Sequence, residues 1–259
     1  MIKKICFCLI FGMLATSASA LEVRHNLTAF VGPFNAATAE FTYRLQPATY
    51  AVESIIRTNG AFNTLYPFEA NYNTGGKIAK DNMLTTDYRY KSQSRFNSRS
   101  KQTFYDANGN PLYQISGKNG KNKRRDIKLP ADGLPATDLQ TVLAIVIKRY
   151  NEMRFCAGRM PVFDGKRRFD VIFADEGTET VTANRYSPFA GPAAKCSMYI
   201  DKLQEKGDDL LWQLTSDRPI YFWIMQDPSS RAPFIAKIAV QETPLGKMNV
   251  YTTKIEVKK

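Results

Sequence analysis

The chain alternates between apolar and polar residues over most of its length, and this two-residue period is typical of half-buried β-strands. The clearest case is 247–257, where Met248 and Val250 fall on one side and Tyr251 and Ile255 on the other. Strands are predicted at 38–45, 49–58, 83–91, 101–105, 112–116, 169–174, 179–186, 195–203, 220–226, 234–242 and 247–257. Turn residues separate these runs, as in the hairpin loop at 106–111. The pattern predicts about a dozen antiparallel strands.

One stretch departs from this alternation and predicts a helix. Thr137-Asp138-Leu139-Gln140 resembles a capping box, and we expect the helix to span about 137–153. Apolar residues at helical spacing form one stripe, namely Leu139, Val142, Leu143, Val146, Tyr150 and Met153. Such a helix either lines a ligand cavity or packs on a sheet, and a curved sheet is compatible with both. The segment 209–214 is either a second short helix or a wide loop.

The N-terminus has the pattern of a cleaved export signal. Lys3-Lys4 precedes an apolar segment at 5–15, and Ala18-Ser19-Ala20 fits the A-x-A cleavage pattern. The apolar segment is shorter than the roughly 20 residues that a membrane-spanning helix needs. Leu21, rather than a cysteine, would begin the mature chain, so we expect no lipoprotein anchor. We expect residues 21–259 to form a single β-rich domain in the periplasm.

The chain is strongly basic. It holds 36 lysines and arginines against 24 acidic residues, and removal of the two lysines of the signal lowers the net charge from +12 to +10. The densest basic run lies at 118–125 and includes Lys121, Lys123, Arg124 and Arg125. Export makes nucleic acid an unexpected partner, which leaves anionic lipid headgroups, phosphorylated glycolipids or the cell-wall polymer, with peripheral membrane contact. The alternative is a solvated loop that carries a run of charge.

Few residues of the chain suit catalysis or metal binding. His25 is the only histidine, we expect it at the surface, and no G-x-S-x-G motif accompanies it. Neither the ligands of a zinc site, nor a phosphate-binding glycine loop, nor a D-x-D-x-D-G calcium loop is present, so no metal or cofactor is expected. Carboxylate pairs remain, among them Asp164/Asp170, Asp175/Glu176 and Asp208/Asp209. Such a pair is what a hydrolase acting on a cell-wall glycan would need.

Two cysteines remain after the signal is removed, Cys156 and Cys196. In an oxidising compartment they most simply form one disulfide. The bridge would close a loop of about 40 residues, to which the chain-entropy model assigns about 4 kcal/mol. The alternative is a redox pair, but the chain has neither a C-x-x-C motif nor a cluster that favours a thiolate at these positions.

The stretch 156–171, CAGRMPVFDGKRRFDV, predicts a hairpin. Asp164-Gly165 favours a two-residue turn with positive φ at both positions, flanked by Phe163 and Lys166. Beyond the turn, alternation places Arg167 on the apolar face of the strand. Arg168 and Asp170 share the other face and are expected to screen each other. A guanidinium on the apolar face needs either an internal carboxylate or an anionic ligand group.

Aromatic residues occupy both faces of several predicted strands. Tyr221 and Trp223 flank Phe222 on one strand, and the earlier aromatic residues are Tyr88, Tyr90, Phe96, Phe104, Tyr105 and Tyr113. These side chains either fill the core of a sheet that is covered on both faces or form an apolar concave surface for a lipid or a partner peptide.

Cys156 and the following Pro-Val-Phe-Asp-Gly-Lys-Arg-Arg-Phe-Asp segment at 161–170 resemble a family of proteobacterial envelope proteins, domain-of-unknown-function family 3108. Asp138-Leu139 and Cys196 also fit that family's pattern. The resemblance implies an exported protein with a strongly curved antiparallel sheet. Its fold would be similar to the lipoprotein-carrier superfamily that includes LolA and LolB, and to periplasmic β-spiral envelope proteins. The resemblance implies no active site.

We therefore expect a mainly β protein, a half-barrel or β-spiral, with the helix at about 137–153 packed on its sheet. The expected function is non-enzymatic: binding of an amphipathic envelope component or an envelope protein, in support of envelope integrity. Possible partners are a lipid, a lipoprotein, a glycan or an envelope protein. The alternatives are a carboxylate-dependent hydrolase acting on a wall glycan and a pure protein scaffold without a small ligand.

Overall fold

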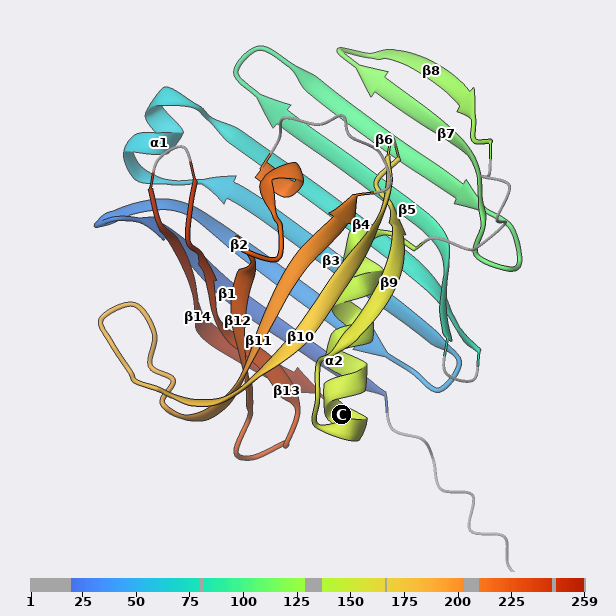
Figure 1. Cartoon of the computed structure of the whole chain (residues 1–259). Coiled ribbons are helices and arrows are strands. Elements are labelled where there is room, and N and C mark those ends of the chain that lie inside the picture. Colours follow the sequence, from blue (N-terminus) through green and yellow to red (C-terminus); the bar gives the residue numbers. More distant parts are fainter. Residues whose placement is uncertain are drawn as a thin grey trace, which may run out of the picture.

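Figure 1 shows the computed structural model of the chain. The structure describes residues 20–79, 82–128, 137–165, 167–202, 210–243 and 246–258. The predicted signal peptide, apart from Ala20, lies outside the described residues, as do Lys166 and the Asp208/Asp209 pair. Among the helices in these ranges, none is long and apolar enough to cross a membrane.

The described residues form one antiparallel sheet of fourteen strands, in the order β8-β7-β6-β5-β4-β3-β2-β1-β14-β13-β12-β11-β10-β9. The strands are β1 (Leu21–Val31), β2 (Phe34–Leu45), β3 (Thr49–Thr58), β4 (Phe68–Ala79), β5 (Asn82–Ser94), β6 (Ser98–Tyr105), β7 (Pro111–Lys118), β8 (Lys121–Asp126), β9 (Gly158–Phe163), β10 (Arg168–Val181), β11 (Gly191–Lys202), β12 (Ile220–Gln226), β13 (Pro233–Val240) and β14 (Met248–Lys258). Within β1–β8 and within β9–β14, each strand pairs with the next one in sequence. The pairing of β1 with β14 joins these two halves, and β8 and β9 are the edges.

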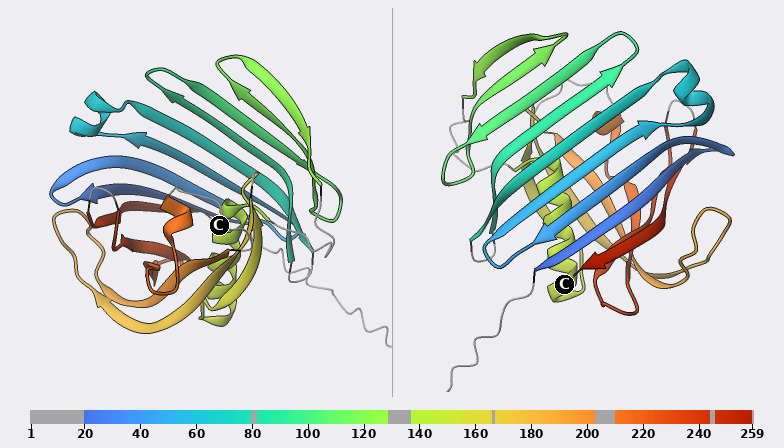
Figure 2. Two further views of the ribbon diagram at one scale, coloured as in Figure 1. Left: turned by 45° about the horizontal axis from the view of Figure 1, so that its top comes forward. Right: turned by 180° about the vertical axis from the view of Figure 1, so that it is seen from behind.

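The sheet curves around the helix α2 (Leu139–Met153), as Figures 1 and 2 show from three directions. The helix contacts β3 and β5 of one half and β9 and β13 of the other. The predicted fold class, a mainly β protein with one large curved antiparallel sheet and a helix packed on it, is therefore confirmed.

The N-cap of α2 is Asp138, one residue later than the predicted capping box places it. Its carboxylate accepts hydrogen bonds from the main-chain N–H groups of Gln140 and Thr141, at 2.9 and 3.2 Å. The helix ends where Arg154 adopts the left-handed conformation, with φ 62°. The predicted apolar stripe holds for Val142 and Val146, whereas Met153 is exposed at the end of the helix.

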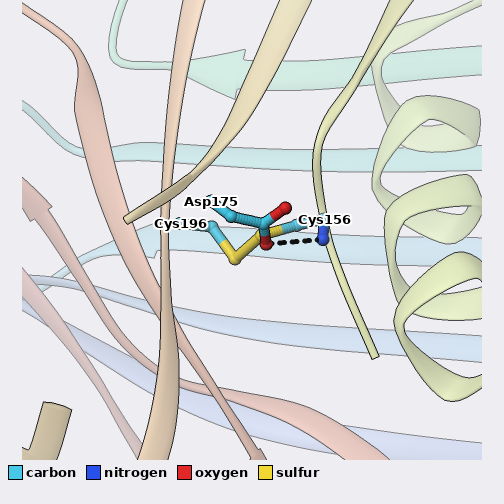
Figure 3. A group of neighbouring side chains, drawn as sticks. All are labelled: Cys156, Asp175 and Cys196. Atoms are coloured by element: carbon cyan, nitrogen blue, oxygen red, sulfur yellow. Dashed lines mark hydrogen bonds between the residues drawn. A yellow bond between two sulfur atoms is a disulfide. The ribbon is translucent and has the colours of Figure 1, made fainter. Parts of the chain in front are cut away.

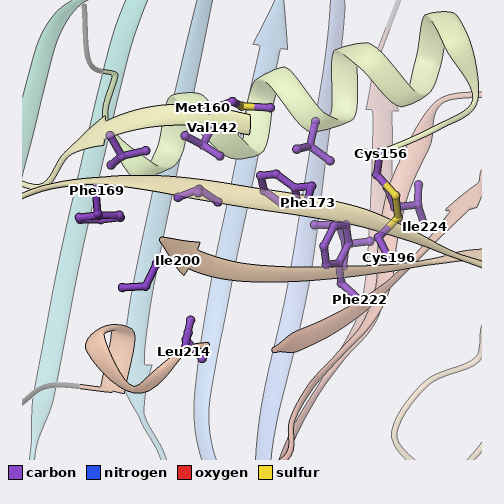
Figure 4. Packing of buried hydrophobic residues seen from close by; sticks show 14 residues of the cluster. Val142, Cys156, Met160, Phe169, Phe173, Cys196, Ile200, Leu214, Phe222 and Ile224 are labelled. Carbon is purple, nitrogen blue, oxygen red and sulfur yellow. A yellow bond between two sulfur atoms is a disulfide. The ribbon is translucent and has the colours of Figure 1, made fainter. Parts of the chain in front are cut away.

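The two halves of the sheet bury separate apolar clusters against opposite sides of α2. Figure 4 shows the cluster in which Val142 and Val146 pack against β9–β12, including Phe169 and Phe173 of β10. A second cluster packs the helix, through Ala144 and other residues, against β1, β2, β3 and β5. Complete burial of a side chain such as Phe169 contributes about 2–3 kcal/mol, so these clusters hold the sheet in its curved form.

Several predicted elements differ from the observed ones. The run at 179–186 is not one strand, because β10 ends at Val181 and a turn follows, closed by the bond from Asn184 N–H to the Ser187 carbonyl oxygen. Strands β1, β4 and β8 lie outside the predicted runs, whereas β9 is the first strand of the hairpin predicted at 156–171. The helix α1 (Gly60–Leu65) was not predicted, and the segment 209–214 contains a short 3-10 helix, η1 (Leu210–Gln213).

Candidate functional site

The hairpin β9–β10 has a different turn from the predicted one. Phe163 pairs with Arg168 rather than with Lys166, and Asp164 N–H donates to the Arg167 carbonyl oxygen at 3.1 Å. Gly165 has φ 89°, but Asp164 is not in the left-handed region. The reason lies in the Asp164 side chain, whose Oδ1 accepts the Arg167 main-chain N–H at 2.7 Å and so closes the turn.

Arg167 directly precedes β10, on the side of its apolar face, and is only 8% exposed. It shares that face with Phe169, Val171 and Phe173, which are all buried. Its Nε and Nη2 donate hydrogen bonds to Asp164 Oδ2 at 2.9 and 2.7 Å. The guanidinium is therefore paired with a carboxylate of its own turn.

The opposite face of the hairpin carries a second carboxylate. Asp170 accepts a hydrogen bond from Arg159 Nε at 2.7 Å, and Arg159 Nη2 reaches Asp201 at the same distance. Arg168 is half-buried on this face, and the ion pair of Asp170 is with Arg159 rather than the expected one with Arg168. Asp164 and Asp170 are thus held on different faces of the hairpin by different arginines.

The tip of the hairpin docks onto the other half of the sheet. Lys101 Nζ, on β6, donates to the Asp164 carbonyl oxygen at 2.9 Å, and Arg125 Nη2, on β8, donates to the Gly165 carbonyl oxygen. A Cβ atom on Gly165 would lie 2.3 Å from Nε2 of Gln114, so only glycine fits this contact without a shift. The turn thus connects the β9–β10 edge of the sheet with β6 and β8, which lie at the other edge.

The basic run at 118–125 is not a loop but the end of β7, a turn, and the edge strand β8. Arg125 pairs with Gln114, whose side chain is buried, so every second residue of β8 faces the interior of the curved sheet. The interior-facing cations are Lys121, Lys123 and Arg125. Arg124 lies on the opposite face, with its guanidinium 3.9 Å from the centre of the Tyr113 ring.

A hollow of about 260 Å³ lies between the start of α2, the hairpin tip and the inner face of β3–β5. We call it the inner chamber; its lining is Ser54, Ile56, Tyr72, Tyr88, Asp138, Leu139, Gln140, Phe163 and Asp164. Most of this lining is apolar or aromatic. Burial raises the pKa of Tyr72 to about 12 and also raises the pKa of Tyr88, so both phenol groups are uncharged at neutral pH. Burial also lowers the pKa of Lys101, which lies beside the chamber, while Asp164 opposes that shift.

The polar end of the chamber is a network centred on the Asp138 carboxylate. The hydroxyl groups of Thr74 and Thr85 each donate to it at 3.0 Å, and that of Thr141 donates at 2.7 Å. Together with the two N–H groups of the helix start, five hydrogen bonds hold this buried carboxylate. Tyr50 extends the network, with its hydroxyl 2.8 Å from the Thr141 hydroxyl. The network fixes the start of α2 to β3, β4 and β5.

The predicted disulfide is confirmed: Cys156 and Cys196 are bridged, with their Cα atoms 6.4 Å apart. Figure 3 shows Asp175 beside the bridge. Its carboxylate accepts the N–H groups of Cys156 and Ala157, at 3.0 and 3.2 Å. These two cysteines and Asp175 form a cluster that could hold a metal ion, but both sulfur atoms are committed to the disulfide and neither is a thiolate ligand.

Tyr221 and Trp223 lie away from the inner chamber. Phe222 points toward α2 and belongs to the cluster in Figure 4, so its neighbours point to the other face of β12. There, Trp223 Nε1 donates to Glu179 at 2.9 Å, and Lys237 lies 4.5 Å from the ring centre. Aromatic residues therefore cover both faces of β12, but they do not form one site with the hairpin.

The expected surface position of His25 is wrong. β1 is a central strand, and the His25 side chain is 1% exposed. Its ring packs against Phe41, Tyr43 and Phe234, with centroids 5.7, 5.8 and 6.2 Å away. Burial lowers the pKa of His25 to about 4. Hydrophobic alternation in 21–31 would have signalled this strand, since Val23, His25 and Leu27 fall on one face.

A larger hollow, of about 840 Å³, lies near α1 and the turns that join β5 to β6 and β7 to β8. Polar side chains predominate in its lining, among them Asn63, Asn71, Ser98, Asn119 and Asn122, together with Lys91 and Arg99. This hollow was not predicted from the sequence, because its lining residues come from segments that are far apart along the chain.

The fold and these sites define an open β-barrel-like protein with a helix inside its curved sheet. Residues 25–253 match the family described as "Protein of unknown function (DUF3108)", and the chain belongs to this family. A crystal structure of a β-barrel-like protein of domain of unknown function DUF1849 from Brucella abortus is similar in fold. That likeness has a TM-score of 0.50 at 10% identity and covers 93% of this chain and 99% of that one. The curated proteins contain no match to the chain. The expected likeness to the lipoprotein carriers stays a prediction.

Proposed function

We propose that this protein is a non-enzymatic component of the cell envelope that binds an anionic amphipathic molecule, a phosphorylated lipid or glycolipid, in the inner chamber. One observation carries the proposal: the apolar and aromatic walls of the chamber adjoin the hairpin turn, which Lys101 of β6 and Arg125 of β8 contact. The apolar part of the ligand would contact Ile56, Tyr88 and Leu139. Its charged group would meet Lys101 and Arg125, which contact the hairpin turn beside the chamber, and then Lys123, which lies on the same face of β8 as Arg125.

The size of the chamber limits what it encloses. Its volume of about 260 Å³ is slightly below the range of small-molecule pockets, which measure about 300–1,000 Å³. The chamber therefore holds one segment of an amphipathic molecule, and the rest would follow the basic inner face of β6–β8. We place the protein in the periplasm, after cleavage of the signal peptide behind Ala20, where such molecules occur.

The alternative function, a carboxylate-dependent hydrolase acting on a wall glycan, has less support. Glycoside hydrolysis needs two carboxyl groups that flank one bond of the substrate. Asp164 and Asp170 point to opposite faces of the hairpin, and each is paired with its own arginine. This arrangement favours binding over hydrolysis at the hairpin.

Titration calorimetry with dodecyl phosphate and the uncharged dodecyl maltoside tests the proposal on the chain from Leu21. We expect dodecyl phosphate to bind more tightly. Lys123→Glu should weaken that binding roughly tenfold, which corresponds to about 1.4 kcal/mol. Arg124→Glu is the matched control, because it makes the same charge change on the opposite face of β8 and should leave the affinity within about twofold.

A second matched pair tests the apolar wall. Ile56→Gln places an amide in the chamber, whereas Ile55→Gln makes the same change on the other face of β3. Only the first should weaken binding of both detergents. Native mass spectrometry of gently purified protein gives a further readout. An empty protein that binds neither detergent would contradict the proposal and favour a scaffold without a small ligand.

A further inference from the structure

Four turns lie at the same end of the sheet, because successive strands of an antiparallel meander reverse direction. We call them the turn rim; they are residues 32–36, 59–67, 94–99 and 117–122. In Figure 1 they follow one side of the molecule, from the β1–β2 turn past α1 to the tip of β7–β8.

Hydrogen bonds connect each turn of the rim to the next. Asn59 N–H donates to the Ala36 carbonyl oxygen at 2.9 Å, which ties the start of α1 to β2. Arg95 Nη2 donates to the Thr64 carbonyl oxygen at 2.8 Å, and Asn119 N–H donates to the Ser98 carbonyl oxygen at 3.0 Å. The rim is therefore one continuous surface rather than four independent loops.

The rim carries the most exposed large apolar side chains of the described residues. They are Phe34, Leu65, Tyr66 and Phe96, with exposures of 61, 64, 73 and 79%. The other exposed large apolar residues in the described part of the chain, Leu112, Met153 and Phe155, range from 38 to 55% and lie elsewhere. Single exposed apolar residues are ordinary, but four on one connected surface indicate contact with an apolar partner.

The charge of the rim identifies the kind of partner. Its four segments contain Arg95, Arg99, Lys118 and Lys121 and not a single aspartate or glutamate. The turns at the opposite end of the same strands differ: 46–48 and 106–110 have no bulky apolar residue, and the second contains Asp106. Protruding aromatic and aliphatic side chains flanked by cations are the pattern of a protein that rests on an anionic lipid surface.

We propose that the turn rim docks on the surface of an anionic phospholipid bilayer. Phe34, Leu65, Tyr66 and Phe96 enter the boundary between headgroups and acyl chains, and the four cations contact phosphate groups. The hollow of about 840 Å³ adjoins three of the four turns, and Lys91 and Arg99 in its lining would lie next to the lipid headgroups. Docking in this orientation would keep the protein next to a source of amphipathic molecules.

Flotation with vesicles tests the proposal. The chain from Leu21 contains every helix and strand that the structure describes, and it lacks the apolar segment 5–15, which would bind vesicles by itself. We expect binding to vesicles of phosphatidylglycerol mixed with phosphatidylcholine and roughly tenfold weaker binding to phosphatidylcholine alone. Added salt should weaken the binding, because the cations are exposed.

Two sets of substitutions locate the contact. The combined variant F34S/L65S/Y66S/F96S removes the apolar contacts, and R99Q/K118Q removes two cations; each should lower vesicle binding about tenfold or more. The matched controls are L112S/M153S, two exposed apolar residues off the rim, and K77Q near the other end of β4. These should bind vesicles as the parent chain does. Thermal melting by circular dichroism verifies that every variant is folded.

Failure of the parent chain to bind either vesicle, or full binding by the folded rim variants, would overturn the proposal. A parent dimer that the rim substitutions convert to monomer in size-exclusion chromatography, without vesicle binding, would also overturn it and assign the rim to self-association. The rim does not depend on the inner chamber. I56Q should bind vesicles normally, so failure of one proposal leaves the other distinguishable.

Discussion

Arg167 donates from two atoms of its guanidinium, Nε at 2.9 Å and Nη2 at 2.7 Å, to a single carboxylate oxygen of Asp164. The two residues close the turn of the hairpin β9–β10, and the main-chain carbonyl oxygens of Asp164 and Gly165 in turn accept hydrogen bonds from Lys101 and Arg125. The ion pair thus shapes the turn that connects the two halves of the sheet. Its partner is a carboxylate of the protein, which supports a structural role for Arg167.

Replacement of Arg167 should therefore lower stability. Arg167→Leu leaves the Asp164 carboxylate without this partner in a largely buried place, and we expect a loss of about 3 kcal/mol in the free energy of unfolding. Arg167→Lys keeps the charge but not the two-atom contact, so its loss should be smaller. Urea denaturation measures both.

The control for Arg167 is on the same hairpin. Arg159→Leu also removes an arginine that pairs with a carboxylate, but this arginine is exposed to solvent, so its loss should be much smaller. Stability that is unchanged in Arg167→Lys, together with weaker binding of dodecyl phosphate, would instead assign Arg167 to the ligand.

Asp138 should be the most sensitive polar residue of the inner chamber. Asp138→Ala removes the N-cap of α2 and leaves the buried hydroxyl groups of Thr74, Thr85 and Thr141 with one partner fewer. We expect a loss of about 3 kcal/mol, measured by urea denaturation. Asp138→Asn retains an acceptor for the helix N–H groups and should lose less.

The neighbouring Thr137 provides the control for the cap. The capping-box pattern in the sequence would make Thr137 the N-cap, whereas in the structure its hydroxyl contacts only Thr85 among the side-chain bonds described. Thr137→Ala should therefore cost less than Asp138→Ala. The reverse order would show that the helix begins one residue earlier than described.

The sequence predicted strands well where one face of the strand is buried. β3 and β12 match their predicted ranges at both ends, and alternation placed Arg167 on the buried face of β10. β8 was missed because its sequence, Lys-Asn-Lys-Arg-Arg-Asp, has no apolar residue, and it is a strand only because β7 offers a hydrogen-bonding edge. β4 was missed because Gly75-Gly76 and two asparagines interrupt its pattern, although both of its edges are paired.

The contacts that assemble the site could not be predicted from one sequence. The bonds from Lys101 and Arg125 to the hairpin span 63 and 40 residues along the chain, and they depend on how far the sheet curves. Local pattern determines which face a side chain occupies, but not which distant strand that face will meet. For the same reason, the four turns of the rim are ordinary polar loops in the sequence and become one surface only in the fold.

Removal of the disulfide should destabilise the protein. The double variant Cys156→Ser/Cys196→Ser should lose about 4 kcal/mol, the chain-entropy value for a closed loop of about 40 residues. The parent chain in a reducing agent should unfold at the same urea concentration as this variant. In the absence of reductant, unfolded protein from Leu21 should not react with maleimide; two reactive thiols per chain would contradict the bridge.

His25 should make the free energy of unfolding depend on pH between about 6.5 and 4. Burial lowers its pKa from 6.5 to about 4 in the folded protein, so between these values the unfolded chain binds a proton that the folded chain does not. The contribution of neutral His25 is complete above pH 6.5 and decreases as the pH falls toward 4, by about 3 kcal/mol in total. Carboxylates with lowered pKa values, such as Glu22 and Glu179, lose their contributions mainly at lower pH, and a variant separates the two effects.

His25→Phe keeps an aromatic ring among Phe41, Tyr43 and Phe234 but cannot be protonated. Its free energy of unfolding, measured with urea from pH 7 to pH 4.5, should fall less steeply than that of the parent chain. Parallel curves for the two proteins would mean that His25 is protonated as easily in the folded chain as in the unfolded one, and that its burial between β2 and β13 is wrong.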